Sequence, residues 1–503
     1  MSYHVFMTTA APRQASGGAS APGARHAVTL IAGDGIGPEV AQATKAILEA
    51  AGARIDWEDA VAGKEAFDKG IGNGVAPETL ESLARTRVAL KGPLETPVGH
   101  GGKSANVTLR KLFEMYGNIR PCKELPNVQG PFAGRGIDLI VVRENVEDVY
   151  AGIEHMQTPG VAQCLKLISQ KGCEKIVRLT YELARAQGRK MVHTATKANI
   201  MKMTEGYLKR VAEQVSQEYP DIKSEHIIID NCCHKLVMSP EKFDVIVSTN
   251  MNGDIVSDLT SGLVGGLGLA PSMNIGDDAI MFEAVHGTAP DIAGQDKANP
   301  TALLLAAVMM LRHFGMFDTA MAIEHALWVT LEGGTFTGDI ALGRPAVGTK
   351  KFTETIMSNL GKTSAGLGTR EYKPIKMPQV AKAPDLVKAA QRQDVGVDVF
   401  IESGLLPDAF GKAVEKATWG CALKLKNVSN RGVQVWPTAA SAFDGVDHYG
   451  CRFFPAEPKA KVTDKQVTDL LTKLTTAGLR WMHIEKLIEI DGKPGFAKSQ
   501  GES

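Results

Sequence analysis

Short apolar runs alternate with stretches of helical spacing along the first two thirds of the chain. Residues 28–32 form one such run, and a Gly-rich turn with Pro38 leads from it into helical spacing that continues to Ala50. Glycines permit the tight turn, and a proline suits the first turn of a helix. Further strand-like runs, with helical stretches such as 197–217 between several of them, lie at 88–90, 139–142, 190–193, 227–229 and 245–247. This alternation predicts an α/β fold with a partly parallel sheet up to about residue 345.

The pattern changes after Leu360. Residues 362–393 lack clear periodicity and predict a linker, and the chain beyond them predicts a small α+β domain. Its expected strands are 395–401, 423–428, 433–436, 451–454 and 479–490, and its expected helices are 406–416 and 464–477. The turn residues at 430–432 favour a hairpin. The segment shows no cluster of catalytic residue types, so we expect an interaction or assembly domain.

The bulk composition excludes some classes of protein. The chain has 503 residues, of which 44% are apolar and 22% charged, as in ordinary soluble globular proteins. Lys plus Arg and Asp plus Glu both number 56, so net charge gives no attraction to nucleic acid or to an anionic membrane. The longest apolar stretch, residues 303–311, is too short to cross a bilayer. We therefore expect neither nucleic acid nor membrane as a partner.

The cysteines and the N-terminus indicate the compartment. Seven scattered cysteines without metal-ligand spacing fit reduced thiols in a cytosol-like environment. Residues 1–24 are rich in Ala, Ser and Gly, contain no acid and are expected to be disordered. Such a start weakly resembles an organelle transit peptide, but a floppy bacterial N-terminus fits better. We therefore expect a cytoplasmic protein, with the mitochondrial matrix as the alternative.

Two aspartates four residues apart carry the first chemical signal. Asp254 and Asp258 follow a strand-like run at 243–248, and their spacing places both carboxylates on one face of a helix. Like charges repel there unless a positive group lies between them, and oxygen ligands suit Mg²⁺ or Mn²⁺. Asp230, at the end of an apolar strand, is a candidate third carboxylate. The alternative is an ordinary acidic helix start, with Asp230 as a turn residue.

Cationic, amide and hydroxyl side chains form a second group. Three arginines near predicted strand ends, together with a hydroxyl and an amide, can hold several carboxylates, because arginine binds carboxylates in a bidentate manner. Tyr150 follows an acidic loop and can act as an acid, and Lys197 stands at a strand-to-helix junction, where α/β folds place reactive groups. Each residue taken alone also fits an ordinary surface or half-buried position. The candidates for carboxylate binding are Thr96, Ser104, Asn106, Arg110, Arg120 and Arg143.

A loop over residues 286–300 precedes the apolar helix expected at 302–311. It reads His286-Gly287-Thr288-Ala289-Pro290-Asp291-Ile292-Ala293-Gly294 and ends at Asn299-Pro300. An acid in such a loop accepts hydrogen bonds from both ribose hydroxyls of a dinucleotide and repels a ribose phosphate, whereas a lysine does the reverse.

Together these blocks resemble the isocitrate/isopropylmalate dehydrogenase family of metal-dependent decarboxylating dehydrogenases. The resemblance runs in order over residues 26–345. It is carried by the motifs Gly33-Asp34-Gly35-Ile36-Gly37-Pro38-Glu39, Asn252-Gly253-Asp254, Ser257-Asp258 and His286-Gly287-Thr288-Ala289-Pro290. The C-terminal extension looks like that of the larger bacterial isocitrate dehydrogenases. The implied architecture is a large cofactor-side domain (25–115 and 265–345), a small dimerisation domain (116–264), a linker (346–394) and the C-terminal α+β domain (395–503).

The resemblance implies a role for each candidate residue. Tyr150 and Lys197 correspond to the acid–base pair. In this family the lysine and the first metal carboxylate reach the site from the partner subunit, so a homodimer with composite active sites is expected. The implied metal ligands are Asp230, Asp254 and Asp258. The implied substrate ligands are Thr96, Ser104, Asn106, Arg110, Arg120 and Arg143, and the implied cofactor ligands are His286, Gly287, Thr288, Ala289, Asp291, Ile292 and Asn299.

The implied reaction is the oxidative decarboxylation of isocitrate to 2-oxoglutarate and carbon dioxide with Mg²⁺ or Mn²⁺. Ser104 and Asn106 stand where isocitrate enzymes have polar residues and isopropylmalate enzymes have apolar ones. In NADP-type enzymes of the family that the chain resembles, a Lys-Tyr pair stands where this chain has Asp291-Ile292. We therefore predict NAD rather than NADP as the cofactor. The alternatives are NADP, a related 2-hydroxy acid such as homoisocitrate, isopropylmalate or tartrate, and a non-catalytic regulatory subunit.

Overall fold

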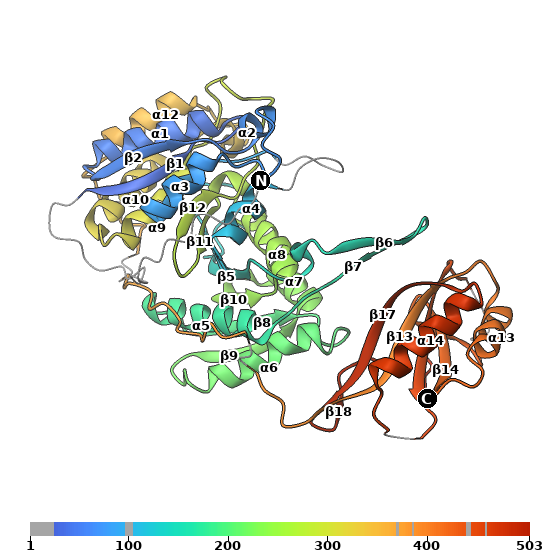
Figure 1. The fold of residues 1–503 in the computed structure, drawn as a ribbon. Helices are drawn as coiled ribbons and strands as arrows, with labels where there is room; N and C mark the ends of the chain where they lie inside the picture. Colours follow the sequence, from blue (N-terminus) through green and yellow to red (C-terminus); the bar gives the residue numbers. More distant parts are fainter. Residues whose placement is uncertain are drawn as a thin grey trace. The chain divides into compact units, whose positions relative to one another are not determined.

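The computed structural model describes residues 25–95, 104–368, 372–384, 387–438, 444–457 and 460–502. The chain divides into two compact units, shown in Figure 1. Unit 1 comprises Met1–Ala151 and Lys166–Ala381, and unit 2 comprises Gly152–Leu165 and Lys382–Ser503.

Unit 1 is built on one ten-stranded sheet. Two parallel groups of four strands lie at its ends, and the antiparallel strands β11 and β4 join them in the middle. In spatial order the strands are β2 (Ile55–Ala60), β1 (His26–Ile31), β3 (Val88–Lys91), β12 (Ile280–Ala284), β11 (Pro271–Ile275), β4 (Gly117–Lys123), β5 (Asp138–Glu144), β10 (Val245–Ser248), β8 (Met191–Thr196) and β9 (Lys223–Ile228). The antiparallel strands β11 and β4 therefore form the centre of the sheet, between its two parallel groups.

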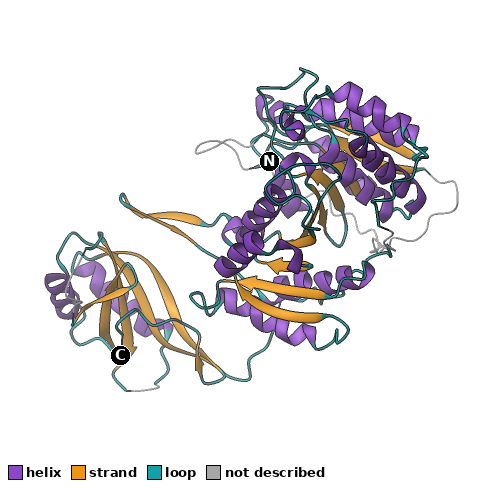
Figure 2. Ribbon diagram, turned by 180° about the vertical axis from the view of Figure 1, so that it is seen from behind, coloured by secondary structure: helices purple, strands orange, loops and turns teal. Residues whose placement is uncertain are grey.

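Helices cover both faces of this sheet, as Figure 2 shows. Helix α9 is apolar almost all round because it is buried, with Leu303, Leu304 and Leu311 fully inaccessible. The helices of unit 1 are α1 (Gly37–Ala50), α2 (Lys64–Asp68), α3 (Pro77–Thr86), α4 (Ala105–Leu112), α5 (Gln170–Ala186), α6 (Thr204–Ser216), α7 (Ile229–Met238), α8 (Asn250–Leu263), α9 (Thr301–His313), α10 (Phe317–Glu332), α11 (Gly338–Ala341) and α12 (Thr349–Ser358). Short 3₁₀ turns are η1 (Val149–Ala151), η2 (Pro240–Lys242) and η3 (Leu267–Leu269).

Unit 2 is a six-stranded antiparallel sheet with two helices and a two-stranded ribbon. The sheet order is β15 (Val433–Trp436), β14 (Leu423–Asn430), β16 (His448–Pro455), β13 (Arg392–Glu402), β17 (Arg480–Ile490) and β18 (Lys493–Pro494). Helices α13 (Pro407–Ala417) and α14 (Asp464–Thr476) share an apolar core with it. The ribbon of β6 (Glu154–Thr158) and β7 (Val161–Cys164) is joined to the rest of unit 2 by the Thr158 hydroxyl, which donates to Asp447 at 2.8 Å.

The mixed α/β architecture with a separate antiparallel C-terminal domain confirms the predicted fold class. Some boundaries differ. The predicted linker, 346–394, contains α12 and the start of β13. The helix expected from Lys197 begins at Thr204, because hydrogen-bonded turns precede it. The expected strand at 227–229 ends at Ile228, which places Asp230 in the first turn of α7.

Two further predictions concern the N-terminal residues and the membrane. Residues 1–24, predicted to be disordered, lie outside the described residues. Across the parts of the chain that the structure describes, no helix combines the length and apolarity needed to cross a membrane.

Candidate active site

A buried arginine anchors the start of α8. Arg143, on β5, is only 1% exposed. Its Nε and Nη2 donate to Asn250 Oδ1 at 3.0 and 2.7 Å, and its Nη1 donates to Asp254. Because a buried guanidinium is costly without partners, these contacts fix both its orientation and the first turn of α8.

A second arginine bridges the aspartate pair. Nη1 of Arg120, from β4, lies 3.2 Å from Asp254 Oδ1 and 3.3 Å from Asp258 Oδ1. Burial would raise the pKa of Asp254, but the neighbouring Arg143 and Arg120 outweigh it and lower that pKa. Burial, helped by the charge of Asp254, raises the pKa of Asp258. The spacing of the two aspartates predicted a positive group between their carboxylates, and Arg120 is that group. An oxygen donor pair of this kind fits a hard divalent cation.

Tyr150 joins this cluster from η1. Its hydroxyl donates to Asp254 Oδ2 at 2.5 Å, and its ring packs 4.9 Å from the Arg143 guanidinium. Burial raises the pKa of Tyr150, and its hydrogen bond to Asp254 raises it further. The phenol therefore holds its proton at neutral pH, next to the carboxylates, as a proton donor should.

Arg110, on α4, is close enough for its charge to lower the pKa of Arg143, and it has a partner that the sequence reasoning missed. Its Nη2 donates to Glu283 Oε1 at 2.7 Å, and Lys91 Nζ lies 2.8 Å from Glu283 Oε2. Burial disfavours the ionised Glu283, but Lys91 and Arg110 outweigh it and lower its pKa. A single acid inside the otherwise apolar β12 was the available signal, because a buried charge needs a partner.

Helix α4 presents polar atoms that lack partners. Asn106 Oδ1 and Arg110 Nε are buried and make no hydrogen bond among the described residues. These two residues are four apart and share one face of the helix, whose N-cap position is Ser104. Buried polar groups are normally satisfied, so this face fits a polar ligand. Thr96, the remaining predicted substrate residue, lies outside the described residues.

Lys197 and Asp230 form a separate and more open pair. Lys197 Nζ donates to Asp230 Oδ1 at 2.9 Å, and the two side chains are 31% and 66% exposed. The lysine, as a hydrogen-bond donor, lowers the pKa of Asp230. Within the described part of this single chain, no three His, Cys, Asp or Glu side chains gather as a metal site. The structure thus brings Asp254 and Asp258 together but leaves Asp230 apart from them.

A buried ionic network underlies these groups and was not foreseen from the sequence. Lys166 Nζ lies 2.5 Å from Asp148 Oδ1 and 2.8 Å from Glu205 Oε1, and both carboxylate side chains are fully inaccessible. Glu205 also accepts from the backbone N–H of Lys197 at 2.9 Å, and Asp148 accepts from that of Met251 at 3.0 Å. The network therefore ties the tyrosine turn, the lysine loop and α8 to one another.

The predicted cofactor loop folds against the Gly-rich turn after β1. The Ile36 N–H donates to the Thr288 carbonyl at 2.9 Å. A Cβ on Gly35, whose φ is +58°, would lie 2.0 Å from that same oxygen, so only glycine permits this approach.

The other cofactor candidates lie along the same loop. His286 Nδ1 is 3.0 Å from the Gly287 carbonyl, and its Nε2 is buried without a partner among the described residues. Ala289 has a φ of +38°. Asn299 donates to Asp339 at 2.9 Å. Asp291 is exposed, whereas Ile292 is partly buried against the core.

Comparisons with known proteins identify the two parts of the chain. The family described as isocitrate/isopropylmalate dehydrogenase matches residues 27–356, and the bacterial isocitrate dehydrogenase C-terminal domain matches residues 392–502. A curated relative named isocitrate dehydrogenase (NADP), from Thermus thermophilus, is 59% identical over 95% of this chain and 96% of its own length. One of the same name from Rickettsia conorii is 40% identical over 94% and 99%. The crystal structure of the TT0538 protein, also from Thermus thermophilus, has a TM-score of 0.92 at 58% identity, covering 95% of this chain and 97% of that one.

These relatives overturn the cofactor prediction. Both curated proteins are named as NADP enzymes, so the preference for NAD that we predicted from Asp291-Ile292 was wrong. The reason lies in the loop: Asp291 is exposed, so its carboxylate can turn into solvent instead of facing a ribose phosphate, and the cationic Lys297 follows on the same loop. Because the family model matches residues 27–356 and the Thermus thermophilus relative is 59% identical over 95% of the chain, the chain belongs to the isocitrate/isopropylmalate dehydrogenase family.

Proposed function

We propose that this protein oxidises and decarboxylates isocitrate to 2-oxoglutarate and carbon dioxide, with NADP as the hydride acceptor and Mg²⁺ or Mn²⁺ as the metal. The observation that carries the proposal is one cluster at the centre of the sheet. There Arg120 and Arg143 hold Asp254, Asp258 is bridged to it, and Tyr150 donates to the same carboxylate.

The substrate class follows from the charges around this cluster. Arg110, Arg120 and Arg143 converge from α4, β4 and β5, and three guanidinium groups suit a tricarboxylate. The unpartnered amide oxygen of Asn106 favours a polar substituent next to α4. An isopropyl group there would leave this buried amide unpaired, at a cost of about 1–3 kcal/mol. Isocitrate therefore fits better than isopropylmalate.

The proton movements follow from the side chains. Asp254 and Asp258 would hold a divalent metal, which when bound would supply the Lewis acidity that the oxidation and the decarboxylation need. Lys197 helps to remove the proton of the substrate 2-hydroxyl. Tyr150, whose pKa is raised, then delivers its proton to the carbon that loses carbon dioxide. The arginines hold the substrate carboxylates throughout and keep the leaving one oriented.

The active site needs a second copy of the chain. Lys197 and Asp230 pair with each other at the surface, away from Asp254 and Asp258. In a homodimer related by a two-fold axis, each chain can supply this pair to the site of the other. The bacterial sources of the two full-length relatives favour the cytoplasm as the location.

A steady-state assay tests the proposal. Isocitrate, homoisocitrate, isopropylmalate and tartrate are each supplied with NADP or NAD, and with Mg²⁺, Mn²⁺ or EDTA. We expect the highest kcat/KM with isocitrate and NADP, and no turnover in EDTA. Faster turnover of another substrate would overturn the assignment, and binding of isocitrate without turnover would indicate a regulatory subunit instead.

A further inference from the structure

A row of buried polar side chains crosses the centre of the ten-stranded sheet on one face. Sheet interiors are normally apolar, and a buried polar group is costly unless it is hydrogen-bonded. The proposed reaction uses the two arginines of this polar row and gives no role to the amides beside them. The members come from five neighbouring strands and are at most 7% exposed: Lys91 on β3, Glu283 on β12, Asn274 on β11, Asn118 and Arg120 on β4, and Arg143 on β5.

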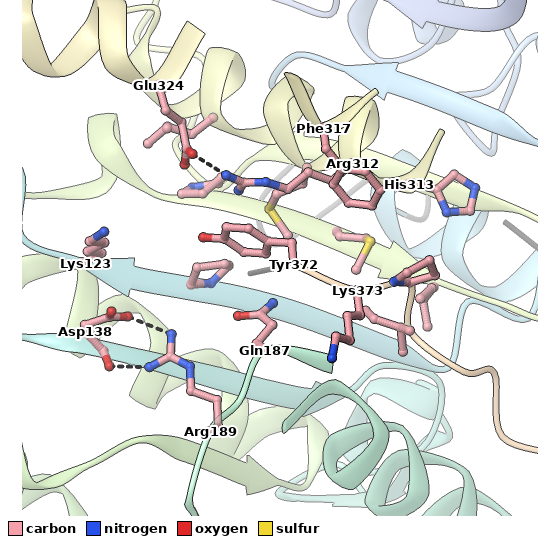
Figure 3. A pocket seen from close by; sticks show the side chains of 18 of the residues that line it. Lys123, Asp138, Gln187, Arg189, Arg312, His313, Phe317, Glu324, Tyr372 and Lys373 are labelled. Atoms are coloured by element: carbon pink, nitrogen blue, oxygen red, sulfur yellow. Dashed lines mark hydrogen bonds and ion pairs between the residues drawn. The ribbon is translucent and has the colours of Figure 1, made fainter. Parts of the chain in front are cut away.

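The opposite face of the same strands is different. Side chains alternate between the two faces along a strand. Met273 and Ile275, which flank Asn274 on β11, line a largely apolar cavity. Lys123 of β4 lines it too, and Figure 3 shows it among the side chains around that cavity. The amides of the polar row therefore point away from the cavity, to the side of the sheet that holds the substrate-binding arginines.

Hydrogen bonds along the polar row connect Arg120 to Arg110. Arg120 Nε donates to Asn118 Oδ1 at 2.6 Å, and Asn118 Nδ2 donates to Asn274 Oδ1 at 2.7 Å. Asn274 Nδ2 donates to Glu283 Oε1 at 2.6 Å, and the same oxygen accepts from Arg110 at 2.7 Å. The two arginines are therefore joined through three side chains, each of which is held at both ends.

Asn274, at the middle of this connection, needs both a donor and an acceptor. Its oxygen accepts from the side-chain amides of Asn118 and Asn145, at 2.7 and 3.1 Å. Its nitrogen donates to Glu283 at 2.6 Å and to the Met281 carbonyl at 3.3 Å. An ionised aspartate would accept at both ends and repel Glu283, and a leucine would offer neither a donor nor an acceptor. A side-chain amide satisfies both ends.

The arginines need such a restraint because they repel one another. Burial lowers the pKa of Arg120, and the positive charge of Arg110 lowers it further. Burial and the charges of Arg120 and Arg110 likewise lower the pKa of Arg143. Like charges at close range move apart unless they are held. Hydrogen bonds in a stiff, close-packed interior keep the arginines at one spacing before substrate arrives, so a substrate that bridges them need not assemble them.

We propose that Asn274 is a positioning residue that fixes the distance between Arg110 and Arg120, and with it the spacing of the substrate carboxylates that the site accepts. It acts through Asn118 on one side and Glu283 on the other. The inference rests on the proposed function, because the spacing matters only if these arginines bind substrate carboxylates.

Steady-state kinetics of the full-length variant Asn274→Leu, with isocitrate, NADP and Mg²⁺, tests the role. Leucine resembles asparagine in size but breaks the connection, so the KM for isocitrate should rise by about tenfold or more. The kcat should stay within about threefold and the KM for NADP within about twofold, because the arginines hold the carboxylates both before and during the reaction. Asn359→Leu is the control: it removes a buried amide that donates to Thr330 at 2.9 Å and should leave the KM for isocitrate unchanged.

Two inhibitors separate a change of spacing from a general disturbance of the arginines. Malate carries two carboxylates and can bridge two arginines, whereas lactate carries one. In Asn274→Leu the inhibition constant of malate should rise together with the KM for isocitrate, whereas that of lactate should stay within about twofold of wild type. Equal losses for the two inhibitors would overturn the proposal.

Asn274→Asp preserves the shape of the side chain and provides the test if the leucine variant does not fold. Its ionised carboxylate repels Glu283, whereas its protonated form can donate to Glu283 as the amide does. The KM for isocitrate, relative to wild type, should therefore be raised at a pH of about 8 and fall as pH decreases to about 6. A relative KM of one throughout would overturn the role.

The wild-type protein distinguishes this inference from the proposed function. If wild type turns over no isocitrate, the proposed function is wrong and the inference fails with it. If wild type turns over isocitrate and Asn274→Leu keeps the same KM, only the inference is wrong.

Discussion

The two halves of the proposed active site differ in how they are held. The half formed by Arg120, Arg143 and Asp254 is mostly buried and cross-linked, with the Arg143 side chain 2% exposed. The half formed by Lys197 and Asp230 is a single pair at the surface, 31% and 66% exposed. Buried charges must be satisfied within the fold, whereas an exposed pair exchanges partners at little cost. The first half is therefore preformed within each chain, and the second is suited to being completed by another copy.

Mixing two inactive variants gives the largest expected effect and tests this division directly. Lys197→Met and Asp254→Asn homodimers should each be inactive. After unfolding and refolding together, the mixed dimers contain one intact composite site, so activity should return to about a quarter of wild type. Gel filtration and kcat of the refolded mixture measure it. Failure to recover activity, with dimers present, would contradict the composite site.

Removing the tyrosine hydroxyl tests the preformed half alone. Tyr150→Phe loses the proton donor that contacts Asp254, so kcat should fall by about 10²–10⁴-fold. The KM for isocitrate and the affinity for Mn²⁺ should change little, because the arginines and aspartates remain. Tyr207→Phe on α6 is the control, and a kcat unchanged in Tyr150→Phe would reject the role.

The buried network should matter to stability far more than a surface ion pair. Lys166→Met leaves Asp148 and Glu205 buried without their cation, at a cost of about 3–5 kcal/mol in the free energy of unfolding. The matched change Lys209→Met removes an exposed pair on α6 and should cost at most about 0.5 kcal/mol. Urea unfolding compares the two, and equal losses would show that burial is not what distinguishes these pairs.

A buried carboxyl near the tyrosine turn gives the protein a pH dependence. Burial raises the pKa of Glu144 to about 7 from its ordinary 4.5. Folding therefore favours its protonated form: this stabilisation is complete below 4.5 and is lost as pH rises through about 7. Glu144→Gln should remove up to about 3 kcal/mol of pH-dependent stability over that range. Unfolding curves at several pH values measure it, and the exposed Glu213→Gln should keep the wild-type profile.

The smallest expected effect concerns the exposed cofactor loop. Asp291→Lys with Ile292→Tyr adds a cation that can reach the ribose phosphate, so kcat/KM for NADP should rise by about tenfold, a gain of about 1.4 kcal/mol. The KM for isocitrate should stay constant. A fall in kcat/KM for NADP would show that Asp291 helps to hold this cofactor.

Sequence reasoning worked where the signal was local and failed where it depended on distant partners. The periodic runs predicted β1, α1, β5 and α9 to within a few residues, because the spacing of apolar residues indicates which face of a helix or strand is buried. The network of Lys166, Asp148 and Glu205 stayed hidden, as did the contact of Arg110 with Glu283, 173 residues away. The amino-acid sequence alone does not show which charged residues, far apart in the chain, contact each other. The wrong cofactor prediction also came from missing three-dimensional information. The effect of Asp291 on the choice between NAD and NADP depends on the direction in which its exposed side chain points.

A long-range strand pairing within the first parallel group of the sheet also has a consequence for biosynthesis. Strand β3 pairs with β12, about 190 residues later, with Val88 beside Ile280. At a synthesis rate of about 5–20 residues per second, β3 waits about 10–40 s for this neighbour while its edge stays open. Contacts of such long range slow folding and expose strand edges to other chains. The same wiring that brings Glu283 to Arg110 therefore leaves the nascent N-terminal half prone to aggregate, and we expect its yield on expression to depend on chaperones.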